Sequence, residues 1–551
     1  MMRSIPWKES LETEFKSDLR YYNDHDLIEE IVSMTNTEGG VLYLGVEDDG
    51  AITGIHPDHD DSIGVAALIA NSTVPPVSVR AEVVAEEGQQ VLRIEIPKSR
   101  TVVSTASGKI LRRRLKQDGS PQKTPMFSYE IPSRLSALGL LDFSAQPLPD
   151  ATVDDLDPAM RVLLRQIIQS RPGGDKSLLT LPDDELDAAL RLVTRVGDWP
   201  VPTVTGMLLI GKEARITELA PTAKSSFQVL EGTTVRLNEE SSKPLLRLFD
   251  TYETYITAWN PERELLDGFY RLPIPEFDRA AFREGLVNAF SHRDYTMLGA
   301  VRVLIDDEGL TITSPGGFID GVNLQNLLTV EPCGRNPALA DALKRIGLAE
   351  KTGRGIDRIF EGSILYGRPW PDYSESTSRS VRLFIPRARP DIAFTKFLTE
   401  EQNRQGKALS IYALMILSLL NTERRCSLRQ LEEETHLPPG KLQSALESLI
   451  ESGLITASGK GDRRIFTTGR RFGQDSGKMA EAIAHTDLSA GYEWEKVMAL
   501  AARQQGIITK QDIADDLKVT PSQAYAIIRQ LCQQGRLALL QSGKYSKYRM
   551  V

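Results

Sequence analysis

Glu284–Tyr295 reads Glu-Gly-Leu-Val-Asn-Ala-Phe-Ser-His-Arg-Asp-Tyr, and this stretch predicts a helix with one polar edge. Glu284 and Asn288 are four residues apart, which places them one turn apart on a single helix face. Leu286 and Val287 supply apolar contacts to neighbouring elements. A carboxylate that activates water beside a carboxamide that holds Mg²⁺ is suited to nucleotide hydrolysis. The alternative is a core helix whose polar edge has no chemical role.

The residues that follow form an ordered series of strands, turns and glycine loops. Strands are expected at 300–306 and 310–313, and the loop 314–318 reads Ser-Pro-Gly-Gly-Phe. Arg335-Asn336-Pro337 opens a further helix, with proline well placed in the first turn. The segment 351–357 reads Lys-Thr-Gly-Arg-Gly-Ile-Asp and places glycines before another helix, where backbone amides can cradle phosphate.

Length, charge and cysteine content limit the classes of protein to which this chain can belong. A chain of 551 residues predicts three or more domains. Cys333, Cys426 and Cys532 are far apart, so they predict neither a disulfide framework nor a zinc site, and we expect a cytoplasmic protein. No signal core or membrane-spanning run is evident. The net charge is −9, but 456–478 and 493–551 are locally basic, which favours directed contact with phosphates.

The first 142 residues predict a mixed α/β unit. Asn23 or Asp24 can cap a helix that stops at Asn36, and strands are expected at 41–46 and 91–96. The segment resembles the Schlafen-AlbA family in a series of words that keep the family's order: Glu9-Ser10, Glu14-Phe15-Lys16, Asn36-Thr37-Glu38-Gly39-Gly40, Gly45-Val46-Glu47-Asp48 and Gly54. The resemblance implies a nucleic-acid-binding domain.

Some Schlafen members are RNases, and the resemblance carries their acidic residues onto this chain. Glu9 and Glu14 fall on the two glutamates, and the third acidic position falls on Glu47 or Asp48. Three converging carboxylates could hold Mg²⁺ or Mn²⁺ for phosphodiester cleavage of RNA or DNA. The alternative is an acidic turn and a salt-bridged strand, with Lys16 and Arg20 neutralising the carboxylates.

A basic strand at 108–115 supplies a second candidate surface in this unit. Arg112, Arg113, Arg114 and the following Lys116 are expected to contact phosphates. The alternative is a solvated strand edge that prevents aggregation of the sheet.

The series from 284 to 357 resembles the Bergerat (GHKL) ATPases, and in particular the divergent ATP-binding domain of helicase-like putative transcriptional regulators. The resemblance implies binding of ATP with Mg²⁺, with Glu284 as the general base and Asn288 as the Mg²⁺ ligand. It also implies a loop under the base and a phosphate lid, formed by Gly316 and Gly317 and by Lys351, Gly353, Arg354 and Gly355. Thr313 and Ser314 stand where the family has an adenine-binding carboxylate, which weakens selection for adenine. His292-Arg293-Asp294 is either a structural helix end or a further phosphate contact.

Two C-terminal segments follow one plan of helices and a β-ribbon, and both resemble winged helix-turn-helix domains. In the second copy, the expected contacts to double-stranded DNA are Ser522, Gln523, Tyr525 and Arg529 in the groove and Lys544, Lys547 and Arg549 on the wing. In the first copy, Arg463 and Arg464 are wing candidates, with Lys441, Gln443 and Ser444 facing outward. Glu432-Glu433-Glu434 would repel phosphate there, so the second copy is expected to read DNA and the first to pack or dimerise.

We therefore expect an α/β and α+β multidomain protein containing a Schlafen-AlbA-like domain, a GHKL-like α/β sandwich and tandem winged helix-turn-helix domains. The predicted divisions are 1–142 for the Schlafen-AlbA-like domain, 143–157 for a linker, 158–270 for a connecting region, 271–395 for the ATP-binding domain, and 405–475 and 490–551 for the winged helices. The expected function is a nucleotide-responsive, homodimeric DNA-binding transcriptional regulator, of the sort that can sit in a phage-defence locus. A metal-dependent nuclease and a GHKL-type ATPase remain the alternatives, and RNA is a further candidate partner.

Overall fold

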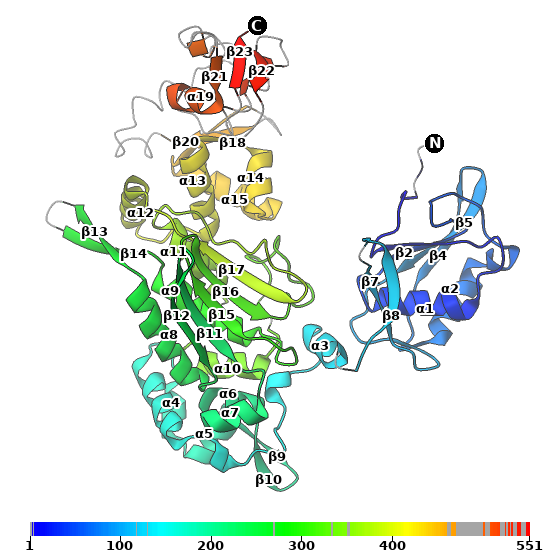
Figure 1. Cartoon of the computed structure of the whole chain (residues 1–551), viewed down its shortest axis with the longest axis horizontal. Coiled ribbons are helices and arrows are strands. Elements are labelled where there is room, and N and C mark those ends of the chain that lie inside the picture. Colours follow the sequence, from blue (N-terminus) through cyan, green and yellow to red (C-terminus); the bar gives the residue numbers. More distant parts are fainter. Residues whose placement is uncertain are drawn as a thin grey trace.

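The structure is a computed structural model, shown in Figure 1. It describes residues 3–469 except 4, 117, 129, 268, 269, 332, 333, 350–352 and 460–463. Beyond residue 469 it describes 497, 500, 501, 507–517, 524, 527, 528, 531, 532, 537–541 and 547–550. Three expected DNA-contacting groups therefore fall outside the described residues, namely Arg463, the groove residues Ser522, Gln523, Tyr525 and Arg529, and Lys544.

The N-terminal unit is a four-stranded sheet covered by two helices. The sheet order is β1-β2-β5-β4, with β1 and β2 parallel and the other pairs antiparallel. The helices α1 and α2 enclose a separate apolar core against this sheet. The elements are β1 (Thr13–Lys16), α1 (Asp24–Thr35), β2 (Gly40–Leu44), the 3-10 helix η1 (Pro57–His59), α2 (Ser62–Ser72), β3 (Thr73–Val74), β4 (Arg80–Glu86), β5 (Gln89–Ile96), β6 (Ser104–Thr105), β7 (Leu111–Leu115) and β8 (Pro121–Pro125).

Sequence chemistry explains the boundaries of α1. The side chain of Asn23 accepts a hydrogen bond from the His25 amide, as an N-cap does, and Asp24 and Asp26 lie in the first turn. The helix ends at Asn36, whose carboxamide bonds to the backbone of Val103 and Leu111. The predicted helix from 23 or 24 to 36 is thus present.

The segment 143–157, predicted as a linker, is instead part of the main body. It contains η2 (Phe143–Ala145) and η3 (Val153–Asp155), and Ala151 and Leu156 are buried in the large apolar core. Its aspartate residues serve as caps rather than as part of a flexible spacer, because Asp155 accepts a hydrogen bond from the Thr152 amide and Asp157 accepts one from the Ala159 amide at the start of a helix at 158–170.

A helical region follows this segment and packs beneath the central sheet in Figure 1. Its elements are α4 (Pro158–Ser170), η4 (Lys176–Thr180), α5 (Asp183–Ala189), β9 (Val193–Val196), β10 (Trp199–Pro202), α6 (Val204–Ile210) and α7 (Glu213–Leu219). The helix α3 (Glu130–Ala137) precedes the whole body and connects it to the N-terminal unit.

The central sheet has five strands in the order β12-β11-β15-β16-β17. Two of its strands come from before residue 270, so the predicted boundary between a connecting region and an ATP-binding domain divides one sheet. The elements are β11 (Ser225–Glu231), β12 (Thr234–Ser241), α8 (Leu245–Trp259), β13 (Glu262–Asp267), β14 (Tyr270–Pro275), α9 (Arg279–Ser291), β15 (Val301–Ile305), β16 (Gly309–Pro315), α10 (Pro337–Ile346), α11 (Gly355–Ile364) and β17 (Ser380–Pro386). The boundary was misplaced because β11 pairs in parallel with β15, about seventy residues later, and local sequence patterns do not reveal such pairing.

Two C-terminal groups of elements follow the same order of helix and strand. The first contains α12 (Ile392–Gln405), α13 (Ile411–Glu423), β18 (Arg425–Ser427), α14 (Leu428–Thr435), α15 (Pro439–Glu451), β19 (Ile455–Ser458) and β20 (Ile465–Thr468). The second contains β21 (Ile507–Thr509), α19 (Lys510–Leu517), β22 (Leu537–Gln541) and β23 (Lys547–Met550). The small sheets have matching orders, β18-β20-β19 and β21-β23-β22, as the predicted repeat requires.

One continuous apolar core runs from Ala151 to Phe466. It joins the helical region, the central sheet and the first C-terminal group, so these parts share buried side chains. The described residues of the second group have their own core, which contains Ile513, Ile528 and Tyr548. No described helix is long and apolar enough to cross a bilayer.

Candidate functional site

The predicted polar helix is α9, and it packs on the central sheet and on α11. Gly285 allows the close approach to the sheet, because a Cβ there would lie 2.8 Å from Leu383 and 3.2 Å from Ile312. The same helix contacts α11 through two of that helix's glycines. A Cβ on Gly362 would lie 2.8 Å from the Cβ of Ala281, and a Cβ on Gly355 would overlap the carboxylate of Glu284.

Glu284 therefore lies against the first residue of α11. It is buried, with 8 % of its surface exposed. The first amides of a helix and its dipole favour a negative charge, so this position is suited to a carboxylate or to a phosphate. The charge of Glu284 also reaches the buried Tyr373, whose pKa is raised by burial and, to a smaller extent, by that carboxylate.

Asn288 lies one turn further along the same face of α9. Since Ala281 faces Gly362 and Glu284 faces Gly355, the face continues past the first turn of α11 to Asn288. Its side chain is half-buried and makes no hydrogen bond to any residue within the described part of the chain. A carboxamide oxygen in that position fits a Mg²⁺ ion bound with phosphates.

The predicted adenine contacts do not lie together at this site. Ser314 is buried, and its hydroxyl donates to the carbonyl of Ala289 over 2.6 Å. Thr313 lies on the opposite face of the sheet, because neighbouring residues of a strand alternate and Ser314 faces α9. Asn288 could hold Mg²⁺ and the first turn of α11 could hold phosphate, whereas Thr313 and Ser314 lie on opposite faces of the sheet and cannot bind adenine together.

The two loop glycines have a backbone role. Gly316 has φ +97°, and a Cβ would lie 2.7 Å from that of Asp294. A Cβ on Gly317 would lie 2.8 Å from the backbone of Ser378. Both residues are buried, so they allow close packing rather than forming an open loop around a ligand.

The predicted phosphate lid is described from Gly353 onward, and Lys351 lies outside the described residues. Gly353 adopts a left-handed conformation with φ +74°. Arg354 is exposed and forms ion pairs with Asp357 at 3.4 Å and Glu361 at 3.5 Å on its own helix. The Arg354 side chain is 58 % exposed although its partners are largely buried, so solvent weakens these pairs and Arg354 can reorient toward a bound phosphate.

The helix end His292-Arg293-Asp294 is the centre of a buried polar cluster, in line with the structural alternative. Arg293 is fully buried and donates to the carbonyls of Thr222 and Gly299. Asp294 accepts hydrogen bonds from Ser133 at 2.5 Å and from Arg335 at 3.4 Å. Burial, aided by the charge of Arg335, lowers the pKa of His292 to about 4, so His292 is neutral at pH 7.

This cluster connects the main body to α3. Besides the Ser133–Asp294 bond, the amide of Asp320 donates to the carbonyl of Ala137, and Lys98 pairs with Asp320 at 2.5 Å. The sequence pattern predicts Arg335 only as a residue that opens a helix. Its contact with Asp294 depends on a tertiary approach that the local pattern does not encode.

Three of the four acidic residues of the predicted nuclease site are engaged by different partners. Glu14 is buried and pairs with Lys16 and with Arg113. The Glu9 carboxylate accepts from the Phe15 amide at 3.0 Å, Glu47 accepts from Ser17 and Thr53, and Asp48 is exposed. Among the described residues, the one group of three metal-type ligands within 4.8 Å is His25, Asp26 and Glu29. The geometry thus favours the salt-bridged alternative, with Arg113 rather than the exposed Arg20 as the second cation.

The predicted basic strand is β7, and all three of its arginines are already paired. Arg113 is 3 % exposed and pairs with Glu14, so it cannot also contact an external phosphate. Arg112 and Arg114 both pair with Glu130 of α3, the latter at 2.6 Å. Lys116 is exposed at the end of the strand and remains suited to phosphate contact. The prediction is thus corrected for Arg113, because alternation along β7 directs it into the core.

The first C-terminal group has the helix and ribbon order of a winged helix-turn-helix. Lys441, Gln443 and Ser444 are exposed on α15, as expected, and Arg464 lies 5.4 Å from the ring of Phe466. In the second group, Arg549 is exposed on β23, whereas nothing is described of the Lys547 side chain.

A contact network that the sequence did not reveal links α11 to α15. The helix α13 packs against α11. Burial raises the pKa of Tyr412 on α13, and the charge of Asp357 on α11 adds to this effect. Lys441 on α15 lies 5.9 Å from the centre of the Tyr412 ring, within the range of a cation–π interaction. The predicted phosphate lid is thus connected through α13 to α15 of the first C-terminal group.

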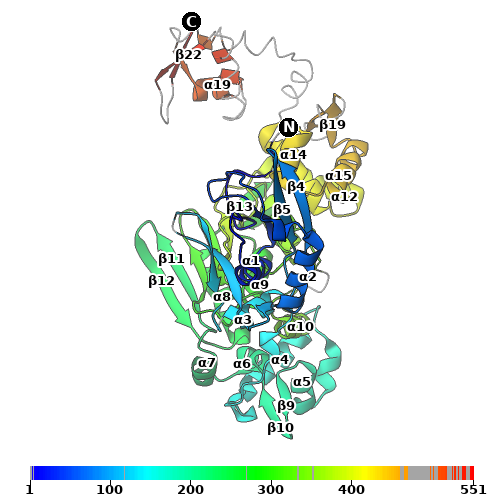
Figure 2. The same ribbon diagram turned by 90° about the vertical axis from the view of Figure 1, so that its right-hand side faces the viewer.

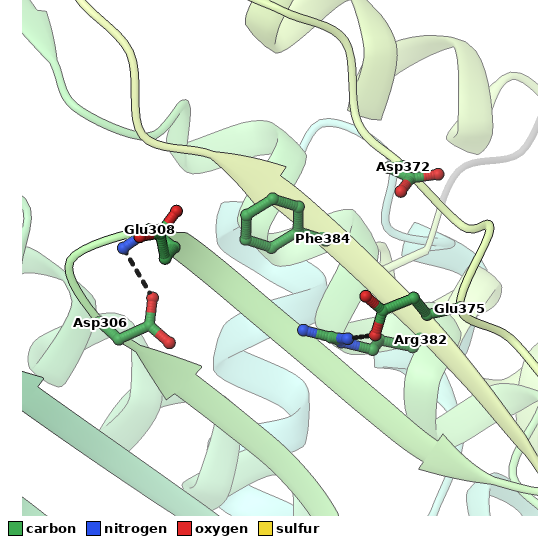
Figure 3. Close-up of a pocket in the computed structure, with 6 residues that line it drawn as sticks. All are labelled: Asp306, Glu308, Asp372, Glu375, Arg382 and Phe384. Atoms are coloured by element: carbon green, nitrogen blue, oxygen red, sulfur yellow. Dashed lines mark hydrogen bonds and ion pairs between the residues drawn. The ribbon is translucent and has the colours of Figure 1, made fainter. Parts of the chain in front are cut away.

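A pocket of about 280 Å³ lies on the other face of the central sheet (Figure 3). It is lined by Asp306, Glu308, Asp372, Glu375, Arg382 and Phe384. Arg382 pairs with Glu375, so the remaining carboxylates make the pocket unfavourable for phosphate. Because Arg382 is opposite Thr313 in the sheet, this is also the face that Thr313 occupies.

Comparisons with known proteins identify three segments. Residues 9–120 match the family model "Schlafen, AlbA_2", residues 299–385 match "Putative ATP-dependent DNA helicase recG C-terminal", and residues 495–546 match "Transcriptional regulator, AbiEi antitoxin". The expected combination of a Schlafen-AlbA-like, an ATPase-like and a regulator-type segment is therefore confirmed. The second match begins after α9, so it does not include Glu284 or Asn288.

A search of curated proteins found no match. Among solved structures, the crystal structure of the DIP2311 protein from Corynebacterium diphtheriae is similar, with a TM-score of 0.51 and 23 % sequence identity. The alignment covers 86 % of this chain and 94 % of that protein. At this identity the likeness establishes the fold, which is a mixed α/β multidomain arrangement.

Proposed function

We propose that the protein is a nucleotide-responsive, DNA-binding transcriptional regulator that acts in the cytoplasm as a homodimer. The observation that carries this proposal is the position of α11. One side of this helix packs on Glu284 of α9, and another side contacts α13 of the first winged-helix group. A change at the start of α11 would therefore be transmitted to α13, in the group that precedes the proposed DNA reader along the chain.

The ligand proposed for this site is a nucleoside triphosphate with Mg²⁺. Asn288 would hold the ion, and the first turn of α11, with Gly353, Arg354 and Gly355, would hold phosphate. A phosphate at this helix end competes with the Glu284 carboxylate for the same favourable position. Displacement of Glu284 would loosen the contact between α9 and α11 and alter the packing of α11 on α13.

The proposed DNA reader is the second winged-helix group, which the regulator-type match supports. Its proposed contacts include Lys547 and Arg549 on β23, together with the groove residues outside the described part of the chain. The exposed Lys116 would give the Schlafen-AlbA-like unit an additional contact with DNA or RNA.

Two binding experiments test this function. Calorimetry with ATP and Mg²⁺ should give measurable heat, which Asn288→Ala should reduce strongly.

Duplex DNA binding by the full chain should weaken steeply with salt. A plot of the logarithm of the binding constant against the logarithm of the salt concentration should have a slope of about −0.9 per phosphate contacted. A chain shortened by residues 490–551 should show a flatter slope. Absence of nucleotide heat, or an unchanged slope after truncation, would contradict the corresponding half of the proposal.

ATP hydrolysis is the second candidate, because Glu284 and Asn288 share a face of α9. Steady ATP consumption that Glu284→Gln abolishes would favour this function. In its present position Glu284 contacts the start of α11, so it must move before it can activate water.

Nuclease activity has less support, since Glu9, Glu14 and Glu47 are engaged by different partners. Nuclease activity would become the better supported of the two if the protein cuts labelled RNA in the presence of metal and if Glu14→Ala abolishes this cutting without unfolding the protein.

A further inference from the structure

The imidazole of His59, in the 3-10 helix η1, is buried in the N-terminal unit and retains 2 % of its surface. One of its nitrogens, Nδ1, lies 2.8 Å from a carboxylate oxygen of Asp18, which is itself fully buried. The other nitrogen, Nε2, is also shielded from solvent and has no hydrogen-bond partner among the described residues. A buried polar atom without a partner is costly, so Nε2 is a candidate to bind a group from outside the chain (the N-terminal unit is also seen in Figure 2).

The surroundings of Asp18 decide which nitrogen of His59 carries the proton. Burial raises the pKa of Asp18, but hydrogen bonds from His59 and from two backbone amides more than offset this effect and lower the pKa. Asp18 is therefore ionised and can only accept hydrogen bonds, so Nδ1 of His59 donates to it. In the neutral imidazole Nε2 then presents a lone pair, which is the form that binds a metal ion.

Nε2 of His59 faces the carboxylate of Asp24, the first residue of α1, across 4.0 Å. This separation is too long for a hydrogen bond, which joins nitrogen and oxygen over about 2.7–3.2 Å, so a proton on Nε2 does not bridge it. A zinc ion bonds to imidazole nitrogen at about 2.0–2.1 Å and to carboxylate oxygen at about 2.0–2.2 Å, so two such bonds span the gap. A tetrahedral angle needs the two atoms about 3.4 Å apart. The Asp24 side chain is 46 % exposed and can make this small shift.

Tyr21 holds both groups in position, and the charge around them is negative. The Tyr21 ring stacks on the imidazole of His59, with centroids 4.6 Å apart, and its hydroxyl donates to Asp24. The pKa of Tyr21 is raised to about 12 by this hydrogen bond, by burial and by the charges of Asp58 and Asp18. In the described part of the chain no lysine or arginine forms an ion pair with any of these three aspartates. The site therefore favours a cation.

We propose that His59 and Asp24 bind a divalent transition-metal ion of the zinc type, with Asp18 fixing the imidazole and water completing the coordination. Histidine ligands commonly donate their second nitrogen to a carboxylate in this way. Imidazole nitrogen favours this class of ion over Mg²⁺ or Ca²⁺. The ion would join η1 to the start of α1. These residues belong neither to the predicted nuclease site nor to the proposed nucleotide site, so the proposal goes beyond the proposed function and is independent of it.

A second set of metal-type side chains on α1 provides the control. His25, Asp26 and Glu29 each place one ligand atom within 4.8 Å of the others. Glu29, however, already pairs with Lys109 at 2.6 Å and with Lys123 at 3.2 Å. Two ammonium groups at this carboxylate disfavour a metal ion there, so the two sets of residues are expected to behave differently.

Calorimetric titration of the full chain with Zn²⁺ alone, without nucleotide or DNA, tests the proposal. The wild type should bind the ion, and Asp24→Asn should weaken this binding by at least about tenfold, because the charged ligand is lost. Asparagine keeps the shape of the side chain and an oxygen that accepts from Tyr21, so the fold should persist. His59→Gln should remove the binding, and the matched control His25→Gln should bind Zn²⁺ like the wild type.

Urea unfolding of the N-terminal unit gives an independent measurement. Zn²⁺ should raise the midpoint for the wild type and for His25→Gln, since an ion that binds the folded state stabilises it, and should leave the midpoint of Asp24→Asn unchanged. Absence of Zn²⁺ binding by the wild type would overturn the proposal. Equal binding by the wild type and Asp24→Asn, or loss of binding in His25→Gln, would place the ion elsewhere and would overturn it as well.

Discussion

Glu14 and Glu284 are both buried carboxylates on regular elements, and the sequence makes both candidates for catalysis, but their surroundings differ. Glu14 in the N-terminal unit is held between Lys16 and Arg113. Glu284 in the main body lies against the first residue of α11. Removing one cation of a buried pair leaves an uncompensated charge, whereas the first turn of a helix also favours other anions such as phosphate. Glu14 is therefore a structural acid, and the switch that we propose is at Glu284.

The largest expected effect tests the structural role of the N-terminal ion pair. Arg113→Ala should destabilise the N-terminal unit by about 3 kcal/mol, because it removes one partner of a buried pair. Arg112→Ala, at the neighbouring and half-exposed position, should cost less than about 1 kcal/mol. Urea unfolding of the two variants measures the difference. Similar losses would mean that Arg113 and Glu14 are not a buried pair.

The next prediction concerns the contact between Glu284 and Gly355. Gly355→Ala should cost about 2 kcal/mol, because the added methyl group overlaps the carboxylate. Combining it with Glu284→Ala should recover at least about 1 kcal/mol in a double-mutant cycle, since space is then available.

The control for this cycle is Gly440→Ala, at a position in α15 where a Cβ meets nothing within 4 Å. It should be neutral or slightly stabilising, because alanine is the better helix former. Strict additivity of Gly355→Ala and Glu284→Ala would show that the two residues are not in contact.

A third prediction sharpens the assignment of the nucleotide site. Asn288→Ala should weaken binding of ATP with Mg²⁺ by at least about tenfold, or about 1.4 kcal/mol. Thr313→Ala should change it by less than about twofold, because Thr313 lies on the opposite face of the sheet. Isothermal titration of both variants measures the two effects, and a larger loss at Thr313 would place the nucleotide elsewhere.

The smallest effect is expected at Lys116. Lys116→Ala should reduce the magnitude of the salt slope for nucleic-acid binding by about 0.9, the value of one phosphate contact. Arg113→Lys should leave the slope unchanged, because that side chain is buried. Filter binding over a range of salt concentrations gives both slopes, and equal changes would contradict the distinction between the two residues.

The sequence predicted individual elements better than their relations in space. The span of α1 follows from its Asn23 cap and the glycines after Asn36, and the turn of helix joining Glu284 to Asn288 follows from helical periodicity. The pairing of Arg113 with Glu14, 99 residues earlier, depends on how β7 approaches β1. Likewise Thr313 faces away from α9 because of strand alternation. The domain boundary at 270 fails because β11 joins β15 across that boundary.

We propose that occupation of the site beside α11 changes DNA binding through α13, in the group that precedes the DNA reader. Fluorescence anisotropy of labelled duplex DNA with the full chain, with and without ATP and Mg²⁺, measures this coupling. We expect a change in DNA affinity of at least about fivefold, which Asn288→Ala abolishes. An equal affinity in both conditions, at nucleotide concentrations that calorimetry shows to saturate the protein, would show that the nucleotide site and the DNA-binding surface are not coupled.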